Sequence, residues 1–178
     1  MSLRGRERSW SSTQTRSAAG AFESVQRIVF PMPVVERSAA GAERLGELYW
    51  RELERSTFGV IRVVRVDMDG LEIRLLGTRP ALLRFGQPVH TVSSNSVSCL
   101  YPIRGGLLAR VPAGSITFTQ RGLDAVEVSS AITEFFPRLA VRRHRLRWPG
   151  LLYPQIQARL HVALGRRYFA RLRREAVR

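Results

Sequence analysis

A strict alternation of apolar and polar residues, interrupted by turn residues at short intervals, limits the folds open to this chain. It is clearest in residues 71–75 (LEIRL), where a strand would present one apolar and one polar face. Asp69-Gly70, at the head of this run, is a strong hairpin signal, and Gly105-Gly106 marks a second turn. No helical periodicity occurs between residues 58 and 136. This argues against a parallel sheet with helical crossovers and predicts an antiparallel meander.

The meander is expected to hold six or seven strands. A further strand precedes it at residues 22–30, where Pro31 ends the alternation. With 44% hydrophobic residues, the chain can bury a core without disulfides, and Cys99 is its only cysteine. The strands predicted within the meander are residues 60–68, 71–75, 81–85, 97–103, 107–111, 116–119 and 125–136.

Two helices are predicted on either side of the meander. Residues 38–55 have apolar residues at helical spacing, with Ser38 as N-cap. Residues 153–174 have a broader apolar arc, so this second helix is expected to lie deep against the sheet. The arc comprises Ala158, His161, Val162, Leu164, Gly165, Tyr168, Phe169 and Leu172, and the opposite side carries Arg159, Arg166, Arg173 and Arg174.

The fold class that follows is α+β: a curved antiparallel sheet wrapped on a long C-terminal helix. Over residues 22–175, this order resembles the START-like (SRPBCC, polyketide-cyclase-like) superfamily, which has the helix-grip fold. The resemblance implies a cavity between sheet and helix for an apolar or amphipathic small molecule or lipid. The alternative is that the same residues form an ordinary core. The cavity candidates are Ile73, Leu75, Ile116, Phe118, Val128, Ile132, Leu160, His161 and Leu164.

Positive charge is concentrated near the C-terminus. All 29 Lys and Arg residues are arginine, and residues 138–178 hold 12 of them against Glu175 alone. The basic connector, residues 138–150, is densest between positions 142 and 148. An arginine fork suits phosphate, and a tryptophan stacks on a base or lies at a lipid headgroup interface. Anion contacts are therefore predicted for Arg142, Arg143, Arg145, Arg147 and Trp148, with a solvated loop as the alternative.

Catalytic and metal-binding patterns are not recognisable in the sequence. His90, His144 and His161 fall on different predicted elements, and no metal or other cofactor is expected. A Cys99 dyad with His90 or His161 is conceivable, although a lone strand cysteine is ordinarily a small buried apolar residue. An enzyme would have to use His161, His90 or a buried carboxylate such as Glu134. Binding is therefore favoured over catalysis.

The rest of the chain suggests one domain with a tail. Residues 1–20 are Ser-, Thr- and Arg-rich and are predicted to form a disordered basic tail before a single domain at 21–178. The tail also has the composition of an organelle transit peptide, and Met32 is an alternative start. No apolar run is long enough to cross a bilayer, so cytoplasmic residence is expected. The alternative function is non-specific association with nucleic acid or an anionic surface through the arginine-rich C-terminal region.

Overall fold

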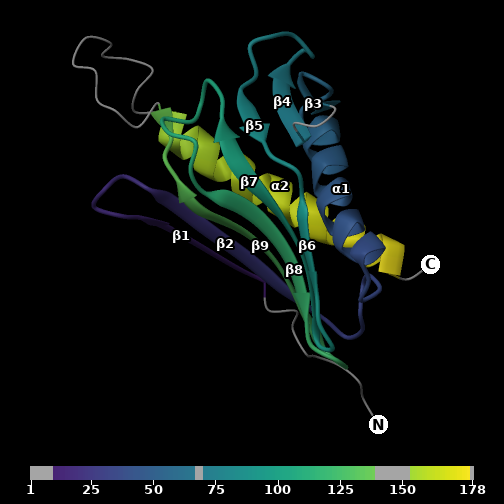
Figure 1. The fold of residues 1–178 in the computed structure, drawn as a ribbon. Coiled ribbons are helices and arrows are strands. Elements are labelled where there is room, and N and C mark those ends of the chain that lie inside the picture. Colours follow the sequence, from purple (N-terminus) through teal and green to yellow (C-terminus); the bar gives the residue numbers. More distant parts are fainter. Residues whose placement is uncertain (1–9, 67–69, 139–152, 177–178) are drawn as a thin grey trace.

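The computed structural model describes residues 10–66, 70–138 and 153–176, and in the last helix it describes side chains from Val162 to Glu175. Its elements form a large sheet with two helices (Figure 1). In chain order they are β1 (Ser11–Arg16), β2 (Phe22–Phe30), α1 (Ala39–Ser56), β3 (Ile61–Val66), β4 (Gly70–Leu75), β5 (Leu83–Phe85), β6 (Val89–Val92), β7 (Ser96–Gly105), β8 (Ser115–Arg121), β9 (Val126–Phe135) and α2 (Tyr153–Ala176).

All strand pairs in the described ranges are antiparallel, and they join in the order β1-β2-β9-β8-β7-β5-β4-β3, with β6 also paired to β7. β5 and β6 share one edge of β7, because β6 pairs with residues 97–100 and β5 with Ile103 and Gly105. The predicted α+β class with an antiparallel sheet and a C-terminal helix is confirmed. The sheet holds nine strands among the described residues, more than the six or seven predicted, because β1 and β2 add to the seven strands from β3 to β9.

Three strand predictions need correction. Residues 11–16, expected to be disordered, form β1 and pair with β2 from Ser11↔Arg27 to Arg16↔Phe22. Their polar side chains give no apolar alternation, and backbone pairing alone places them in the sheet. Residues 107–111 form no strand and make only the isolated bridge Ala109↔Pro137. Residues 81–92 hold two short strands where one was expected.

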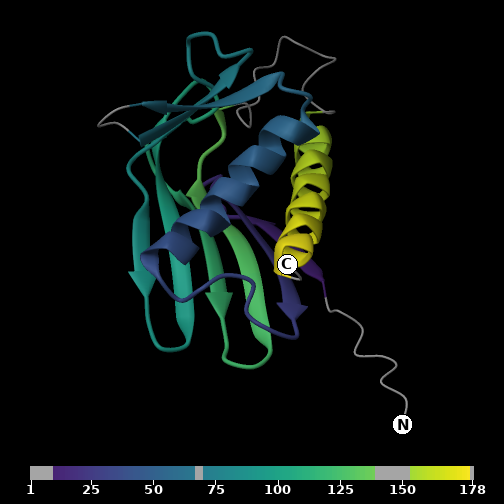
Figure 2. The same cartoon turned by 90° about the vertical axis from the view of Figure 1, so that its right-hand side faces the viewer.

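Both helices lie on the same face of the sheet (Figure 2). α1 packs against β3, β6, β7 and β8, while α2 packs against α1 and β2. The Ser38 hydroxyl accepts a 3.1 Å hydrogen bond from the Gly41 backbone N–H, which confirms the predicted N-cap. Neither helix has, over its described residues, the length and apolar character needed to cross a bilayer. The helix-covered face of the sheet is therefore where a core or a ligand site must lie.

Aromatic side chains fill the space among α1, the C-terminal half of α2 and the middle of the sheet. The Tyr49 ring lies 4.7 Å from the Phe118 ring and 5.5 Å from the Tyr168 ring, centroid to centroid. The Tyr168 hydroxyl donates a 3.2 Å hydrogen bond to the Leu45 carbonyl, which joins the two helices. Gly46 permits close contact with Tyr101, because a Cβ there would lie 2.5 Å from the tyrosine hydroxyl. This part of the interior is a packed core.

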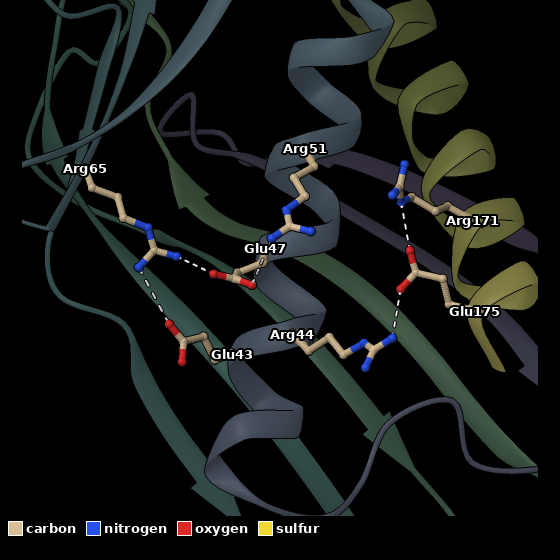
Figure 3. A network of polar contacts seen from close by, with 7 residues as sticks. All are labelled: Glu43, Arg44, Glu47, Arg51, Arg65, Arg171 and Glu175. Atoms are coloured by element: carbon tan, nitrogen blue, oxygen red, sulfur yellow. Dashed lines mark hydrogen bonds and ion pairs between the residues drawn. The ribbon is translucent and has the colours of Figure 1, made fainter. Parts of the chain in front are cut away.

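Ion pairs join the outer surfaces of α1, α2 and β3 (Figure 3). Arg65 of β3 pairs with Glu43 at 3.6 Å and also with Glu47. Glu175 near the end of α2 lies 3.1 Å from both Arg44 and Arg171. Since most of these arginines are exposed, each pair stabilises the fold by less than about 1 kcal/mol. Their main consequence is that the carboxylates of this surface are already engaged.

Candidate functional site

The cavity candidates on the sheet lie in three adjacent cross-strand rows of its helix-covered face. Ile116 and Ile132 pair directly, Phe118 pairs with Ser130, and Val128 pairs with Gln120. Ile116, Phe118 and Val128 are buried, while Ile132 is half-buried. From α2, Leu164 is buried as well, at 8% exposure. These five candidates therefore share one interior.

The other candidates are placed differently. Ile73 is buried, but it belongs to β4, which lies apart from α2 in the strand order. Leu75 was expected to line the cavity, yet it is 47% exposed because it ends β4 where no helix covers the strand. Leu160 and His161 lie in the α2 backbone, one turn before Leu164 and Gly165, and their side chains are outside the described set. Their part in a cavity stays a prediction.

A polar cluster lies beneath α2, where the apolar pattern of the neighbouring rows is interrupted. Ser24 and Gln26 point to the same face of β2, and Gln26 pairs with Ser130 of β9. All three residues are almost fully buried, with exposures of 1%, 0% and 2%. Gly165 of α2 rests directly on the Gln26 side chain, and a Cβ at Gly165 would collide with the Gln26 Oε1. α2 therefore covers the cluster.

The Ser24 and Ser130 hydroxyls make no hydrogen bond with any described residue. A buried polar group left without a partner costs about 1–3 kcal/mol, so nearly all such groups in folded proteins are satisfied. Two of them at one place form a donor and acceptor pair inside an otherwise apolar interior. The sequence does not reveal this cluster, because serine and glutamine within an alternating strand ordinarily indicate its solvent-facing side.

A β-bulge lies next to the cluster. The β2–β9 register shifts between Phe22↔Phe135 and Ser24↔Ile132, so that β9 contains one extra residue. Glu134 occupies this bulge with φ 50°. Bulges commonly adjoin functional sites because they redirect neighbouring side chains. Glu134 was considered as a buried carboxylate for catalysis, but it is exposed, because the bulge turns it to solvent.

A groove runs along the outer flank of α2, beside the polar cluster. It encloses about 320 Å³ between α2 and the β1–β2 edge. Ile28, two residues after Gln26, and Phe169, one helical turn after Gly165, form part of its apolar floor. The Arg166 guanidinium stacks over Trp10 at 4.6 Å from the ring centroid and closes one side. The volume falls at the lower end of the range of small-molecule sites.

A second buried amide on the same face, that of Gln120, stabilises the fold through hydrogen bonds to the backbone. Gln120 of β8 is 1% exposed, and its Oε1 accepts hydrogen bonds from the Val34 and Val35 backbone N–H groups at 2.8 and 3.1 Å. Its Nε2 donates to the Val35 carbonyl at 2.9 Å. These bonds fix the chain between β2 and α1. Gln120 therefore has a structural role that Ser24 and Ser130 do not share.

The residues considered for chemistry do not form an activated pair. Cys99 pairs with His90 across β7 and β6, as the dyad hypothesis requires. However, Cys99 is fully buried, and this burial raises the pKa of its thiol to about 11. The thiol therefore stays protonated at neutral pH and is a weak nucleophile. Within the described ranges, no three His, Cys, Asp or Glu residues are grouped in a way that could hold a metal.

The predicted anion contacts cannot be placed. Arg142, Arg143, Arg145, Arg147 and Trp148 lie outside the described residues. Arg166, Arg167, Arg173 and Arg174 of α2 are described and exposed, and they make no ion pair with a described carboxylate. The outward side of α2 is therefore cationic, as its sequence predicts.

Comparison with known proteins gives only distant likeness. No protein-family model matches the chain, and no curated protein matches it. Among solved structures, CalU16 from Micromonospora echinospora is similar at 12% identity and a TM-score of 0.34, over 71% of this chain and 68% of CalU16. At that level of likeness, the function of this chain has to be argued from its own residues.

Proposed function

We propose that this chain is a binding protein of helix-grip type, which holds a neutral amphipathic small molecule between the sheet and α2. The observation that carries the proposal is the pair of buried hydroxyls, Ser24 and Ser130, without hydrogen-bond partners among the described residues. A ligand carbonyl or hydroxyl would satisfy them. Its apolar body would contact Ile132, which pairs with Ser24, and also Leu164 and Phe169, which lie next to and one helical turn after Gly165 in α2.

The chemistry of the lining favours a ligand whose polar group is uncharged. Ser24 and Ser130 offer hydroxyl groups, which suit a neutral carbonyl or hydroxyl. Burial of an ionised group beside them would require a charge partner, and the cluster contains none. The groove along Trp10, Ile28 and Phe169 is the proposed route of access, because its apolar floor lies next to the cluster. Movement of Arg166 away from Trp10 would widen it.

The test uses Nile red, a neutral carbonyl-bearing aromatic dye that becomes fluorescent in apolar surroundings. The wild-type chain is expected to bind it, and Ser24→Ala/Ser130→Ala is expected to bind at least tenfold more weakly, since two ligand hydrogen bonds of about 1 kcal/mol each are lost. Ser129→Ala is the matched control, because Ser129 is adjacent on β9 but faces the other side. Equal binding by the wild type and both variants would contradict the proposal.

A second candidate function is non-specific nucleic-acid association through α2. It is favoured by four exposed arginines that form no ion pair with a described carboxylate: Arg166, Arg167, Arg173 and Arg174. Each neutralised phosphate would contribute roughly −0.9 to the slope of log K against log salt. Titration of a DNA duplex at two salt concentrations tests it. Failure to bind at the lower concentration would eliminate this candidate and leave the small-molecule proposal intact.

A further inference from the structure

Two turns at one end of the molecule expose a group of large apolar side chains. Phe58, between α1 and β3, is 94% exposed, and Leu76, just after β4, is 66% exposed. Val60 and Leu75 beside them are 46% and 47% exposed. The Leu76 backbone N–H donates a 2.7 Å hydrogen bond to the Val60 carbonyl, which joins the two turns. We call these four residues the turn patch.

The backbone of the turn patch is strained at its two most exposed residues. Phe58 has φ 52° and Leu76 has φ 51°, and glycines at φ 75° follow both. The left-handed region is disfavoured for bulky side chains and readily adopted by Gly and Asn. Of the three non-glycine residues with positive φ in the described ranges, two therefore lie here. Strain of this kind concentrates where function requires a particular side chain.

Arginines surround the turn patch, and no described carboxylate pairs with them. Arg55, Arg62 and Arg79 are all exposed and belong to the same two turns or their flanks. Arg62 lies beside both turns, since a Cβ at Gly59 would be 3.6 Å from its Cζ and a Cβ at Gly77 would be 3.9 Å from its Cγ. This differs from the outer surface of α1, where Glu43 and Glu47 neutralise Arg65.

A shallow hollow adjoins the turn patch and extends its basic border. It encloses about 330 Å³ and is lined by Arg79, Arg84 and Leu107 among others. The Leu107 N–H donates to the Ala81 carbonyl at 3.0 Å, which places this loop against the turn after β4. Glu72 also lines the hollow, but its carboxylate is paired with Arg74 at 2.6 Å. Two arginines are thus left to bind an anion.

We infer that the turn patch docks on an anionic lipid membrane. Phe58 and Leu76 would insert among the lipid headgroups, and Arg62, Arg79 and Arg84 would contact their phosphates. Charge complementarity selects this occupant, because a second copy of a chain with net charge +15 would be repelled from a basic patch. Aliphatic side chains such as Leu76 and Val60 also favour a hydrocarbon interior over stacking on nucleic-acid bases. The inference goes beyond small-molecule binding and does not require it.

The experiment measures co-sedimentation of the full chain with vesicles of phosphatidylcholine, alone and mixed with phosphatidylserine. Binding is expected only to the mixed vesicles and should weaken at high salt. Phe58→Asn and Leu76→Asn should each weaken it about tenfold, because partial insertion of one large apolar side chain contributes roughly that factor. Asn tolerates positive φ, so both variants should fold at least as stably as the wild type.

Matched controls come from the opposite end of the sheet, at the turn between β8 and β9 (Figure 2). Leu123 is 61% exposed there, and Leu123→Asn should leave vesicle binding unchanged. Arg62→Gln and Arg79→Gln should each weaken binding about fivefold, whereas Arg121→Gln should have little effect. Bromine-labelled lipids should also quench a tryptophan introduced by Phe58→Trp.

Three outcomes would overturn the inference. The first is no binding to phosphatidylserine vesicles at low salt. The second is an equal effect of Phe58→Asn and Leu123→Asn on vesicle binding, which would mean that the turn patch is not the docking surface. The third is a dimer in sedimentation analysis that Phe58→Asn dissociates, since the turn patch would then be a self-association surface. Loss of Nile red binding in Ser24→Ala/Ser130→Ala is measured separately and is unaffected by any of these results.

Discussion

Two groups of buried polar side chains on the helix-covered face of the sheet differ in how they are satisfied. Gln120 uses both ends of its amide to hold Val34 and Val35. Ser130 on the neighbouring strand β9 and Ser24 on β2, the next strand along, are as deeply buried but have no hydrogen-bond partner among the described residues. The fold satisfies the buried Gln120 amide with hydrogen bonds to its own backbone. It does not satisfy the two buried serine hydroxyls, and this difference points to a ligand.

The largest expected effect is at Gln120. Replacement by Leu keeps the volume but leaves two backbone N–H groups and one carbonyl without partners. The free energy of unfolding should fall by about 3 kcal/mol or more, since each unsatisfied buried group costs about 1–3 kcal/mol. Urea denaturation measures it, with Gln87→Leu at an exposed position as control. A loss under about 1 kcal/mol would mean that the hydrogen bonds of Gln120 contribute little to stability, so that Gln120 would not differ from Ser24 and Ser130 in structural role.

A second effect is a loss of stability at high pH, and it is expected from Cys99. This residue lies in the same cross-strand row as Phe118 and Ser130. Burial raises the pKa of Cys99 from its ordinary 9.0 to about 11, so the folded state holds the thiol proton more tightly than the unfolded state. Stability should therefore be lost as pH rises from about 9 towards 11, by about 1 kcal/mol at pH 10. Burial also raises the pKa values of Tyr49 and Tyr168, and their contribution is lost above about pH 10.

Urea denaturation at pH 8 and pH 10 tests this expectation. Cys99→Ala should lower stability at both values but show a smaller difference between them than the wild type. A thiol reagent should also leave Cys99 unmodified at neutral pH until the chain unfolds. Rapid modification of Cys99 in the folded chain would show that this cross-strand row is open to solvent. The Ser130 hydroxyl in the same row could then be satisfied by water and would no longer indicate a ligand.

A smaller effect is expected where the aromatic core meets the polar cluster. Tyr168→Phe removes the hydrogen bond to the Leu45 carbonyl that joins α2 to α1. Stability should fall by about 1 kcal/mol, because the Leu45 carbonyl keeps its partner within the helix. Thermal unfolding measures the change. No change would mean that packing alone, without this bond, positions α2 over Ser24 and Ser130.

The sequence predicts this fold well where one residue determines the local structure. Ser38 begins α1 as its N-cap, and strict alternation places β4. It fails where pairing with another strand, and not an apolar pattern, makes the strand: β1 has no apolar pattern of its own and pairs with β2 along its whole length. The polar cluster also escapes prediction, because Ser24 and Ser130 are 106 positions apart and meet only through the β2–β9 register.

The same limit explains the misplaced candidates. Periodicity identified Ile116, Phe118 and Val128 as inward-facing, which agrees with their burial. It could not indicate that Leu75 lies beyond the cover of the helices, or that a bulge turns Glu134 to solvent. Alternation predicts on which face of a strand a side chain lies, but it does not predict which element covers that face. The part of Leu160 and His161 stays a prediction.

The most direct test compares the free energy of unfolding of ligand-free Ser24→Ala/Ser130→Ala with that of the wild type, and then repeats the measurement with saturating Nile red. The account predicts that the ligand-free variant is more stable by about 1–2 kcal/mol, because two unpaired hydroxyls are removed. It also predicts that saturating dye stabilises the variant by at least about 1.4 kcal/mol less than it stabilises the wild type, which is the free-energy equivalent of tenfold weaker binding. A variant that is less stable than the wild type, yet stabilised by the dye to the same extent, would contradict the claim that these hydroxyls are held for a ligand.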